Sequence, residues 1–583
     1  MHTFRVWAPG RRSVEVVVDG RRLRMTKGER GWWEESDSAT KAGSRYGFSL
    51  DGGEVRPDPR SQSQPDGVLG LSEVVDHVAY RWDDAAWRAR AIAEAVVYEL
   101  HVGTFSPEGT FRGAVGLIPH LVALGVDAVE LMPVAEFSGD RGWGYDGVDL
   151  FAPHHAYGGP TELKGLVDAF HAAGLAVVLD VVYNHLGPIG NFLAEFGPYF
   201  SDHHTTDWGA PLNFDGAGSD EVRRFVIDNA AMWIRDYHFD GLRLDAVHAI
   251  VDQSPVHVME QLASEVDAID AQDARLGRST FLIAESDLND PRLVLSRDSG
   301  GYGLATAWAD DWHHALHSVL TGERTGYYGD FGSLELLGKA LRQAWVYDGT
   351  WSAYRQKTRG RKAVGLASGN FVVATQNHDQ IGNRAAGDRL AASVVDGRLK
   401  LAAALLLSSP FIPMIFQGEE WAASSPFQYF TDHSDQHVGD AVREGRRREF
   451  AAFGWDPQDI PDPQDASTYE RSKLVWGELG KPRHQQMLTW HRALIDVRRR
   501  LPRAGNPLGE GVRVEVDDDS GHITFERDGV SVRGNLGTSD WRFAVPPALT
   551  LLMASSPTIE LDGGDVCLPP SSVVVLLSRA ANG

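Results

Sequence analysis

Eight short apolar segments, separated by segments of helical character, constrain the fold of this chain more than any other feature. They lie at residues 95–100, 128–134, 176–184, 241–247, 281–286, 305–310, 371–379 and 410–416. Helical patterns lie between many of them, for example at 161–174, which ends in a glycine. Strands that alternate with helices over roughly 400 residues are typical of a parallel (β/α)8 barrel with insertions. We therefore predict an α/β fold built on a (β/α)8 TIM barrel.

The segments on either side of this pattern read as all-β. Short runs at the amino end are separated by Gly- and Asp-rich turns and followed by a linker rich in Pro, Ser and Gln at 56–67. Past residue 505 a β-like alternation returns. We predict an N-terminal immunoglobulin-like β-sandwich with its linker, a catalytic barrel with an insertion at about 186–222 after the third strand, and a C-terminal β-sandwich. Their limits are 1–88, 89–504 and 505–583.

Charge and composition narrow the classes of partner. The chain has 583 residues, of which 43% are hydrophobic, so it can bury large cores. Asp and Glu number 80 against 56 for Lys and Arg, which gives a formal charge of −24. A nucleic acid would require a basic face, so we expect no nucleic-acid partner. A neutral ligand such as a sugar is compatible with this charge.

The single cysteine and the hydropathy pattern together favour a cytoplasmic location. Cys567 has no partner for an intrachain disulfide, which favours a reducing environment. Arg5 and Pro9 interrupt the amino end, so we expect no signal peptide. The most apolar stretch, 401–416, is broken by serines and prolines and is interpreted as a buried helix followed by a strand. We expect a cytoplasmic protein without a membrane partner.

Acidic residues follow several of the predicted strands. The segment 281–290 reads FLIAESDLND, so Glu285 comes directly after an apolar run. Asp245 and Asp379 occupy similar positions after two other strands. In a (β/α)8 barrel the active site lies at the carboxyl ends of the strands. Three acids on separate strands are therefore expected to converge on one pocket.

Such a set of acids suits the cleavage of a bond between sugars. That reaction needs a protonated carboxyl for the leaving oxygen and an ionised carboxylate for the anomeric carbon. Arg243 lies two residues before Asp245, hence on the same face of its strand, and would keep that carboxylate ionised. Partial burial would raise the pKa of Glu285 and suit it to be the acid. Asp379 would orient the substrate hydroxyls.

Several of these polar residues also allow simpler interpretations. Asp180 is interpreted as a structural acid at the end of its strand. Asn184 could be a calcium ligand, although we favour a hydrogen-bonding role. His313 and His317 are one helical turn apart, but a third ligand is not evident, so zinc is not favoured. We expect neither a metal nor a cofactor.

Four segments, taken together, resemble the signature regions of the α-amylase family of glycoside hydrolases. They are DVVYNH, GLRLDAV, the glutamate of LIAES, and QNHD, in that order along the chain. The resemblance implies that Asp245 is the nucleophile, Glu285 the acid/base and Asp379 the stabiliser of the transition state. It also implies that the sugar at the cleaved bond contacts four further residues, namely Tyr145, His185, Arg243 and His378.

Segments outside these regions are similar to the trehalose-releasing members of the family. They include WADDWHHALHSVLTGE and GEEWAASSPFQYFTDH. The resemblance implies hydrolysis of the α-1,4 bond next to the terminal trehalose of maltooligosyltrehalose, which yields trehalose and a maltooligosaccharide. Candidates for recognition of the leaving sugar are His248, Asp287 and Trp312. A retaining mechanism predicts that the carboxyls of Asp245 and Glu285 lie about 5 to 5.5 Å apart.

Three alternatives remain open at this point. A glucan branching enzyme would use the same barrel and acids but transfer the glycosyl unit to a sugar 6-hydroxyl. A general α-amylase would cleave maltooligosaccharides without a preference for trehalose. A non-catalytic glucan-binding protein would bind through its N-terminal sandwich, and the complete set of acids argues against it.

Overall fold

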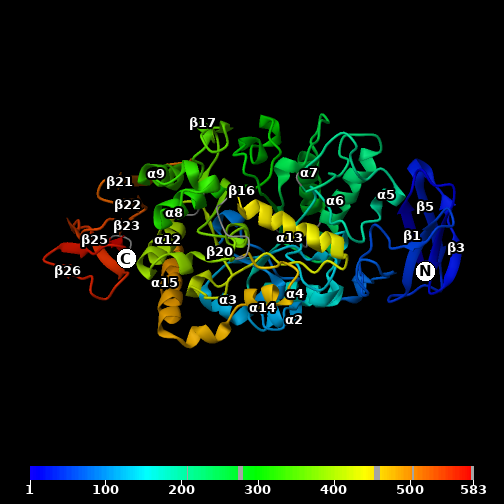
Figure 1. Ribbon diagram of the computed structural model, residues 1–583, viewed down its shortest axis with the longest axis horizontal. Helices are drawn as coiled ribbons and strands as arrows, with labels where there is room; N and C mark the ends of the chain where they lie inside the picture. The colour runs from blue at the N-terminus through cyan, green and yellow to red at the C-terminus, as the bar shows by residue number, and fades with distance from the viewer. Residues whose placement is uncertain (207, 273–279, 452–459, 502–504, 580–583) are drawn as a thin grey trace.

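The computed structural model describes residues 1–206, 208–272, 280–451, 460–501 and 505–579. The N-terminal strands lie at one end of the long axis and the C-terminal strands at the other, with the barrel between them (Figure 1). The predicted end of the barrel domain at residue 504 lies outside the described residues.

The central element is a closed, eight-stranded parallel barrel, which confirms the predicted fold class. Each barrel strand pairs with the next barrel strand along the chain, and the last barrel strand pairs with the first. The barrel strands are β9 (Val97–Leu100), β10 (Ala128–Leu131), β13 (Ala176–Val181), β14 (Gly241–Leu244), β15 (Phe281–Ala284), β16 (Thr306–Trp308), β19 (Phe371–Ala374) and β20 (Ile412–Phe416). All eight lie within the segments predicted from the sequence.

Alternation along the strands sorts side chains between the barrel interior and the helix layer. Val178, Ile283 and Met414 belong to a small buried cluster formed by every second strand residue. Their neighbours, such as Leu179 and Leu282, pack into the larger cluster outside the barrel. At the carboxyl ends of the strands, the inward-facing positions are occupied by polar residues. The candidate site lies there.

Helices follow most of the strands. Those of seven residues or more between barrel strands are α3 (Ile118–Leu124), α4 (Gly159–Ala172), α6 (Ser219–Asp236), α7 (Val258–Gln272), α8 (Asp310–Thr321), α9 (Leu334–Gln343) and α12 (Asp396–Ser408). After the last strand come α13 (Gln436–Ala451), α14 (Ala466–Ser472) and α15 (Pro482–Arg498). The predicted helix and strand within 401–416 are α12 and β20, which confirms that interpretation.

The fifth unit departs from the expected repeat. Between β15 and β16, whose connection is fully described, the chain forms only the short 3-10 turns η6 (Pro291–Leu293) and η7 (Arg297–Ser299). Pro291 removes a backbone donor, and Gly300 and Gly303 have positive φ, so a helix would be interrupted at both ends. The predicted (β/α)8 barrel is therefore formed without an α-helix between its fifth and sixth strands.

Two N-terminal sheets pack against the insertion that follows β13. One sheet contains β1 (His2–Trp7), β5 (Trp32–Asp37) and β4 (Thr26–Lys27), and the other contains β3 (Arg21–Arg24), β2 (Val14–Val18), β6 (Arg45–Leu50), β7 (Val55–Arg56) and β8 (Ser72–Glu73). Trp7 meets the ring of Tyr199 edge-on at 5.2 Å. Arg56 forms an ion pair with Glu195 on α5 (Leu193–Phe196). The N-terminal sheets therefore support the insertion on the side facing away from the barrel.

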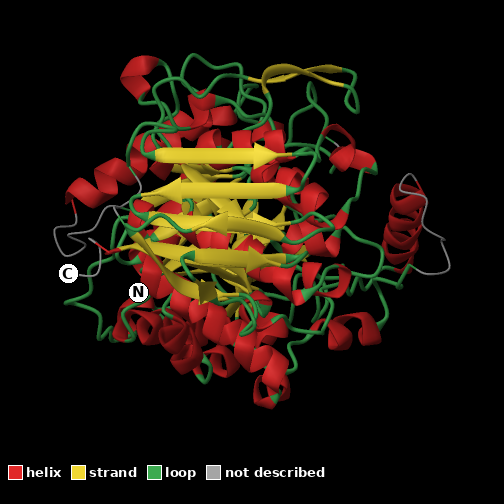
Figure 2. Ribbon diagram, turned by 90° about the vertical axis from the view of Figure 1, so that its left-hand side faces the viewer, coloured by secondary structure: helices red, strands yellow, loops and turns green. Residues whose placement is uncertain are grey.

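The C-terminal strands pack on α12. A five-stranded sheet contains β21 (Val512–Asp517), β22 (His522–Arg527), β23 (Val530–Asn535), β28 (Ser572–Ser578) and β25 (Leu549–Ala554), and a three-stranded sheet contains β24 (Trp541–Ala544), β27 (Asp565–Leu568) and β26 (Leu561–Asp562). These strands lie in front of the barrel in Figure 2. Arg398 on α12 donates to Ser571 Oγ at 3.2 Å. Among the described residues, no helix is both long enough and apolar enough to cross a bilayer.

Candidate active site

Arg243 lies at the centre of the polar cluster at the carboxyl ends of the barrel strands. Its fully buried Nη1 donates to both carboxyl oxygens of Asp180, at 3.0 and 2.9 Å, and to Oδ1 of Asp245 at 2.7 Å. Its Nη2 lies 3.7 Å from Oε2 of Glu285. The Trp308 ring covers the guanidinium, with Cζ 4.2 Å from the ring centroid. One cation therefore contacts acids from three adjacent strands.

Asp245 is held on both carboxylate oxygens. Arg243 donates to Oδ1, and Asn184 Nδ2 donates to Oδ2 at 2.7 Å. The same amide nitrogen lies 3.0 Å from the backbone carbonyl of Asp245, which confirms the hydrogen-bonding role predicted for Asn184. A carboxylate that accepts on both oxygens is suited to the ionised form that a nucleophile needs.

Glu285 follows β15 directly, and its side chain is mostly buried. Burial raises the pKa of its carboxyl well above the usual range, although Arg243 opposes that effect. Its Oε2 accepts a hydrogen bond from the backbone amide of Ala246 at 2.6 Å. Ala246 has the left-handed φ of 41°, a conformation that costs energy outside glycine and that turns this amide toward the acid. Burial thus favours the protonated form of Glu285, and the hydrogen bond from Ala246 fixes the orientation of its carboxyl.

Asp379 differs from the other two acids in being open to solvent. It lies in the first turn of α10 (His378–Gly382), where Asn377 caps the helix, and its side chain is 45% exposed. The adjacent His378 is buried and faces Glu99 with Nδ1. Burial lowers the pKa of His378, but Asp379 and Glu99 more than offset it and raise that pKa to about 9. The site therefore contains a second cation besides Arg243.

Tyr145 connects the two cations. Its hydroxyl donates to Asp180 Oδ2 at 2.7 Å and lies 2.7 Å from His378 Nε2. Its ring stacks on the His378 ring at a centroid distance of 5.3 Å. Burial raises the pKa of Asp180 to about 7, despite the lowering effect of Arg243. Asp180, interpreted from the sequence as structural, holds both Arg243 and Tyr145 in place.

His185 and His248 lie near Trp208, a residue that sequence reasoning missed. The His185 ring lies roughly parallel to that of Trp208 at 5.9 Å, and the His248 ring meets it at 6.3 Å. Trp208 is 50% exposed, which is unusual for so large an apolar side chain. Its position in the Gly-, Asp- and His-rich insertion was the available signal. An exposed indole beside two polar rings can stack on a sugar.

Asp287 and Trp312 were both candidates for contact with the leaving sugar, and the structure places them in different surroundings. Asp287 forms ion pairs with two arginines, Arg355 at 3.0 Å and Arg359 at 2.9 Å. Arg359 lies on the strand β18 (Lys357–Gly360), and Arg355 precedes it. These pairs fasten the hairpin of β17 (Asp348–Ser352) and β18 to the loop after Glu285. Trp312 is fully buried in the core. Trp312 was interpreted either as a substrate contact or as part of the barrel wall, and its burial supports the barrel wall.

The pair of histidines on α8 has ordinary hydrogen-bond partners. His313 Nδ1 donates to the carbonyl of Thr375 at 2.6 Å, and its Nε2 lies 2.9 Å from the Tyr328 hydroxyl. His317 Nε2 lies 2.9 Å from Glu323. These contacts give both histidines a structural role on α8. Asp290, in turn, caps η6 through the amide of Arg292.

Glu130 is a further acid that the sequence did not reveal. It lies on β10 beside Glu99 and is 1% exposed. Its two carboxyl oxygens have no hydrogen-bond partner among the described residues. Burial raises its pKa well above the usual range, and the neighbouring Glu99 adds to that effect. Burial therefore favours the neutral form of Glu130.

Comparison with known proteins identifies the family. The sequence model of the alpha amylase catalytic domain matches residues 57–210. The malto-oligosyltrehalose trehalohydrolase of Rhizobium sp. (strain M-11) is 47% identical, over 98% of this chain and 97% of that protein. The chain belongs to the malto-oligosyltrehalose trehalohydrolase family. It is accordingly a glycoside hydrolase.

Other members and one solved structure agree with this assignment. The malto-oligosyltrehalose trehalohydrolase of Arthrobacter ramosus is 50% identical, over 90% of this chain and 91% of that protein. A crystal structure from Salmonella typhimurium, named as an alpha amylase, has a TM-score of 0.88 and 37% identity, and the match covers 99% of this chain and 97% of that one. The full-length match to trehalohydrolases favours this family over the branching enzymes.

Proposed function

We propose that this chain hydrolyses the α-1,4-glucosidic bond next to the terminal trehalose of maltooligosyltrehalose, releasing trehalose and a maltooligosaccharide. The near-full-length identity to trehalohydrolases supports the substrate. The contact of one guanidinium with both Asp245 and Glu285 supports the chemistry, and it is the observation that carries the proposal. The reaction places the chain in trehalose biosynthesis from α-1,4-glucans.

The mechanism is a retaining double displacement. Glu285 protonates the bridging oxygen while Asp245 attacks the anomeric carbon, and trehalose leaves. Glu285, now ionised, takes a proton from water, which hydrolyses the glycosyl ester on Asp245. Asp379, open to solvent, is placed to bind the hydroxyls of the distorted sugar. The carboxyls of Asp245 and Glu285 are expected about 5 to 5.5 Å apart.

The remaining polar residues bind the sugars on the two sides of the cleaved bond. Tyr145 and His378 form one wall of the site beside Arg243. His185 and His248 form another, beneath Trp208. Asp287 acts on the leaving-sugar side through its hold on the β17–β18 hairpin. No metal or cofactor takes part in this mechanism.

A comparison of two substrates tests the function. The protein is incubated with maltotriosyltrehalose and, separately, with maltopentaose at equal concentrations. Rapid release of trehalose from the first, with slow attack on the second, is expected. Equal rates would identify a general α-amylase. Formation of α-1,6 bonds in amylose, followed by proton NMR, would identify a branching enzyme.

The domain limits and the compartment are proposed on sequence grounds. The division at residues 88 and 504 rests on the change from β-like to alternating patterns. A cytoplasmic setting rests on the single cysteine, Cys567. Trypsin digestion of the folded protein, with mass spectrometry of the fragments, tests the first, and cell fractionation tests the second.

A further inference from the structure

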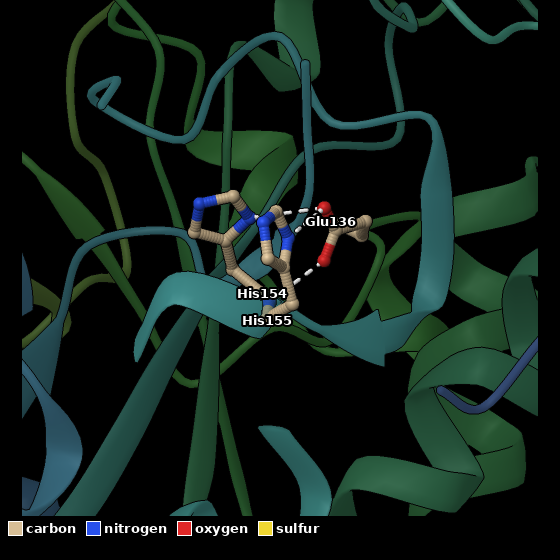
Figure 3. A group of neighbouring side chains, drawn as sticks. All are labelled: Glu136, His154 and His155. Carbon is tan, nitrogen blue, oxygen red and sulfur yellow. Dashed lines mark hydrogen bonds and ion pairs between the residues drawn. The ribbon is translucent and has the colours of Figure 1, made fainter. Parts of the chain in front are cut away.

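A second cluster of ligand-type side chains lies outside the catalytic site. Glu136, His154 and His155 each offer one ligand atom, and these atoms lie within 4.8 Å of one another. Glu136 is on the short strand β11 (Ala135–Glu136), and the two histidines directly follow its partner strand β12 (Asp149–Pro153). Figure 3 shows both imidazole rings beside the same carboxylate.

The distances within this cluster are close to those of a metal site. Glu136 Oε1 lies 3.2 Å from His154 Nδ1 and 2.7 Å from His155 Nδ1. In a tetrahedral site with bonds of about 2.1 Å, ligand atoms lie about 3.4 Å apart. A small outward shift of the His155 ring would therefore admit an ion. Glu136 and His154 have fully buried side chains, so the ion would be mostly shielded from water.

His154 supplies the observation that the surrounding protein does not explain. Among the described residues, Nε2 has no hydrogen-bond partner, and Nδ1 has only its ion-pair contact with Glu136 Oε1 at 3.2 Å, although the residue is 0% exposed. Its ring is fixed by stacking on Phe137 at 3.8 Å, with Nδ1 directed at the Glu136 carboxylate. A buried imidazole with so little hydrogen bonding is costly, and a metal bond to Nδ1 would offset the part of that cost that falls on Nδ1.

His155 has the second contact that metal-binding histidines commonly show. While Nδ1 faces Glu136, its Nε2 lies 3.3 Å from Asp140 Oδ1. Such a carboxylate fixes the orientation of the ring and raises the basicity of the ligating nitrogen. The His155 side chain is 26% exposed, which provides a route for an ion from solvent. The backbone amide of His155 also donates to Glu136 Oε2 at 2.8 Å, which holds the carboxylate in position.

We propose that Glu136, His154 and His155 form a binding site for a divalent transition-metal ion of the zinc class. Two imidazoles and one carboxylate suit zinc, whereas calcium and magnesium prefer sets of oxygen ligands. The site ties Glu136 on β11 to the two residues that follow β12, and these paired strands enclose the segment 137–148. This segment carries Tyr145. The bound ion therefore fastens a loop of the active site without taking part in the reaction.

Metal binding by the intact, untagged protein tests the proposal. The protein is treated with a chelator, exchanged into metal-free buffer and titrated with Zn²⁺ by calorimetry. One Zn²⁺ per chain with micromolar or tighter affinity, a higher Tm with Zn²⁺ and no response to Ca²⁺ or Mg²⁺ are expected. Co²⁺ should give the visible absorption of a four-coordinate ion. A titration that shows no saturable site of micromolar affinity at one Zn²⁺ per chain would overturn the proposal.

Variants show which residues bind the ion. Glu136→Gln and His155→Asn are expected to abolish stoichiometric binding, and Asp140→Asn to weaken it by about 10- to 100-fold. His203→Asn is the matched control, because His203 is an exposed histidine that also pairs with a carboxylate, Asp202. Unchanged binding in Glu136→Gln would refute the site. Should that variant fail to fold, the more exposed His155→Asn decides the question.

Hydrogen exchange tests the proposed effect on the loop. Zn²⁺ is expected to slow amide exchange across 137–148 in the parent protein and to leave it unchanged in His155→Asn. Stoichiometric binding with no change in exchange would contradict the loop-fastening role. Neither readout depends on the glycosidase activity, so failure here is distinguishable from failure of the proposed reaction.

Discussion

Arg359 Nη2 lies 2.9 Å from the carboxylate of Asp287, two residues beyond the proposed catalytic acid. Arg355 pairs with the same carboxylate at 3.0 Å. Electrostatic attraction from these arginines holds the pKa of Asp287 below its usual value, despite burial. Asp287 is thus a link between the loop after β15 and the β17–β18 hairpin.

Asp287→Asn and Arg355→Gln distinguish a direct from an indirect role of this link. Both changes loosen the hairpin, so both are expected to raise KM for maltotriosyltrehalose by about tenfold, the equivalent of one lost interaction of about 1.4 kcal/mol. The KM for maltopentaose should change less. Steady-state kinetics on the two substrates measure the difference. If only Asp287→Asn changes the preference, Asp287 contacts the sugar itself.

Glu285→Gln and Asp245→Asn are expected to reduce kcat by about 10³-fold or more, because each removes one half of the double displacement. A maltosyl fluoride substrate separates the two roles. Its leaving group needs no proton, so Glu285→Gln should still form the covalent intermediate, which mass spectrometry detects. Asp245→Asn should form none. Equal loss with fluoride and natural substrate in Glu285→Gln would argue against its role as the acid.

The pH profile of kcat/KM should fall on the alkaline side as Glu285 ionises. A general acid works only while protonated, and burial raises the pKa of this carboxyl well above its usual range. Activity is therefore retained through neutral pH and lost at higher pH. In Glu285→Gln, assayed with the fluoride, the alkaline limb for formation of the intermediate should be absent. Persistence of the limb would assign it to another group.

Trp208→Ala tests the aromatic residue of the insertion. Loss of the exposed indole removes a stacking surface worth about 1 kcal/mol, so KM should rise several-fold with little change in kcat. Trp208→Phe keeps an aromatic face and should lie close to the parent protein. Leu561→Ala is a control, because Leu561 is also an exposed apolar side chain, at 46%, and lies on the C-terminal strand β26. Unchanged KM in Trp208→Ala would remove this residue from the site.

Glu130→Gln tests the buried acid on β10. Glu130 keeps its proton in the folded barrel but loses it above about pH 4.5 in the unfolded chain, so unfolding releases a proton. Between the ordinary pKa of a glutamate and the raised pKa of folded Glu130, the free energy of unfolding should therefore fall by about 1.4 kcal/mol per pH unit on account of this group. Glu130→Gln should remove that contribution, and the exposed Glu34→Gln should not. Urea unfolding at several pH values provides the measurement.

The barrel was predictable because its strands are buried on both faces and stand out as apolar runs. Acids such as Glu285 were predictable for the same reason, since they end those runs. The missing helix after β15 is a different case. The glycines and Pro291 were visible, but the repeat of strands and helices suggested a complete unit. The backbone preferences of Pro291 and of the glycines prevent a helix after β15.

Contacts between distant segments explain the rest of the differences. The packing of Trp208 near His185 depends on how a long insertion folds back, which periodicity does not specify. Asp287 and Arg359 are 72 positions apart, so their pairing was not legible in the sequence. Glu136 and His154 come together only because β11 and β12 pair. In each case the signal lies in tertiary structure and not in spacing.

The two terminal nitrogens of the Arg243 guanidinium face different acids, Asp245 and Glu285, and this affects how charge moves during turnover. In the proposed mechanism the negative charge resides on Asp245, beside Nη1, before the reaction, and Glu285 is neutral. Once the glycosyl ester forms, Asp245 is neutral and the charge resides on Glu285, which Nη2 faces. The anion thus migrates from one side of a single buried cation to the other, and back when water completes the cycle. Neither half-reaction requires a counter-ion to enter, leave or move.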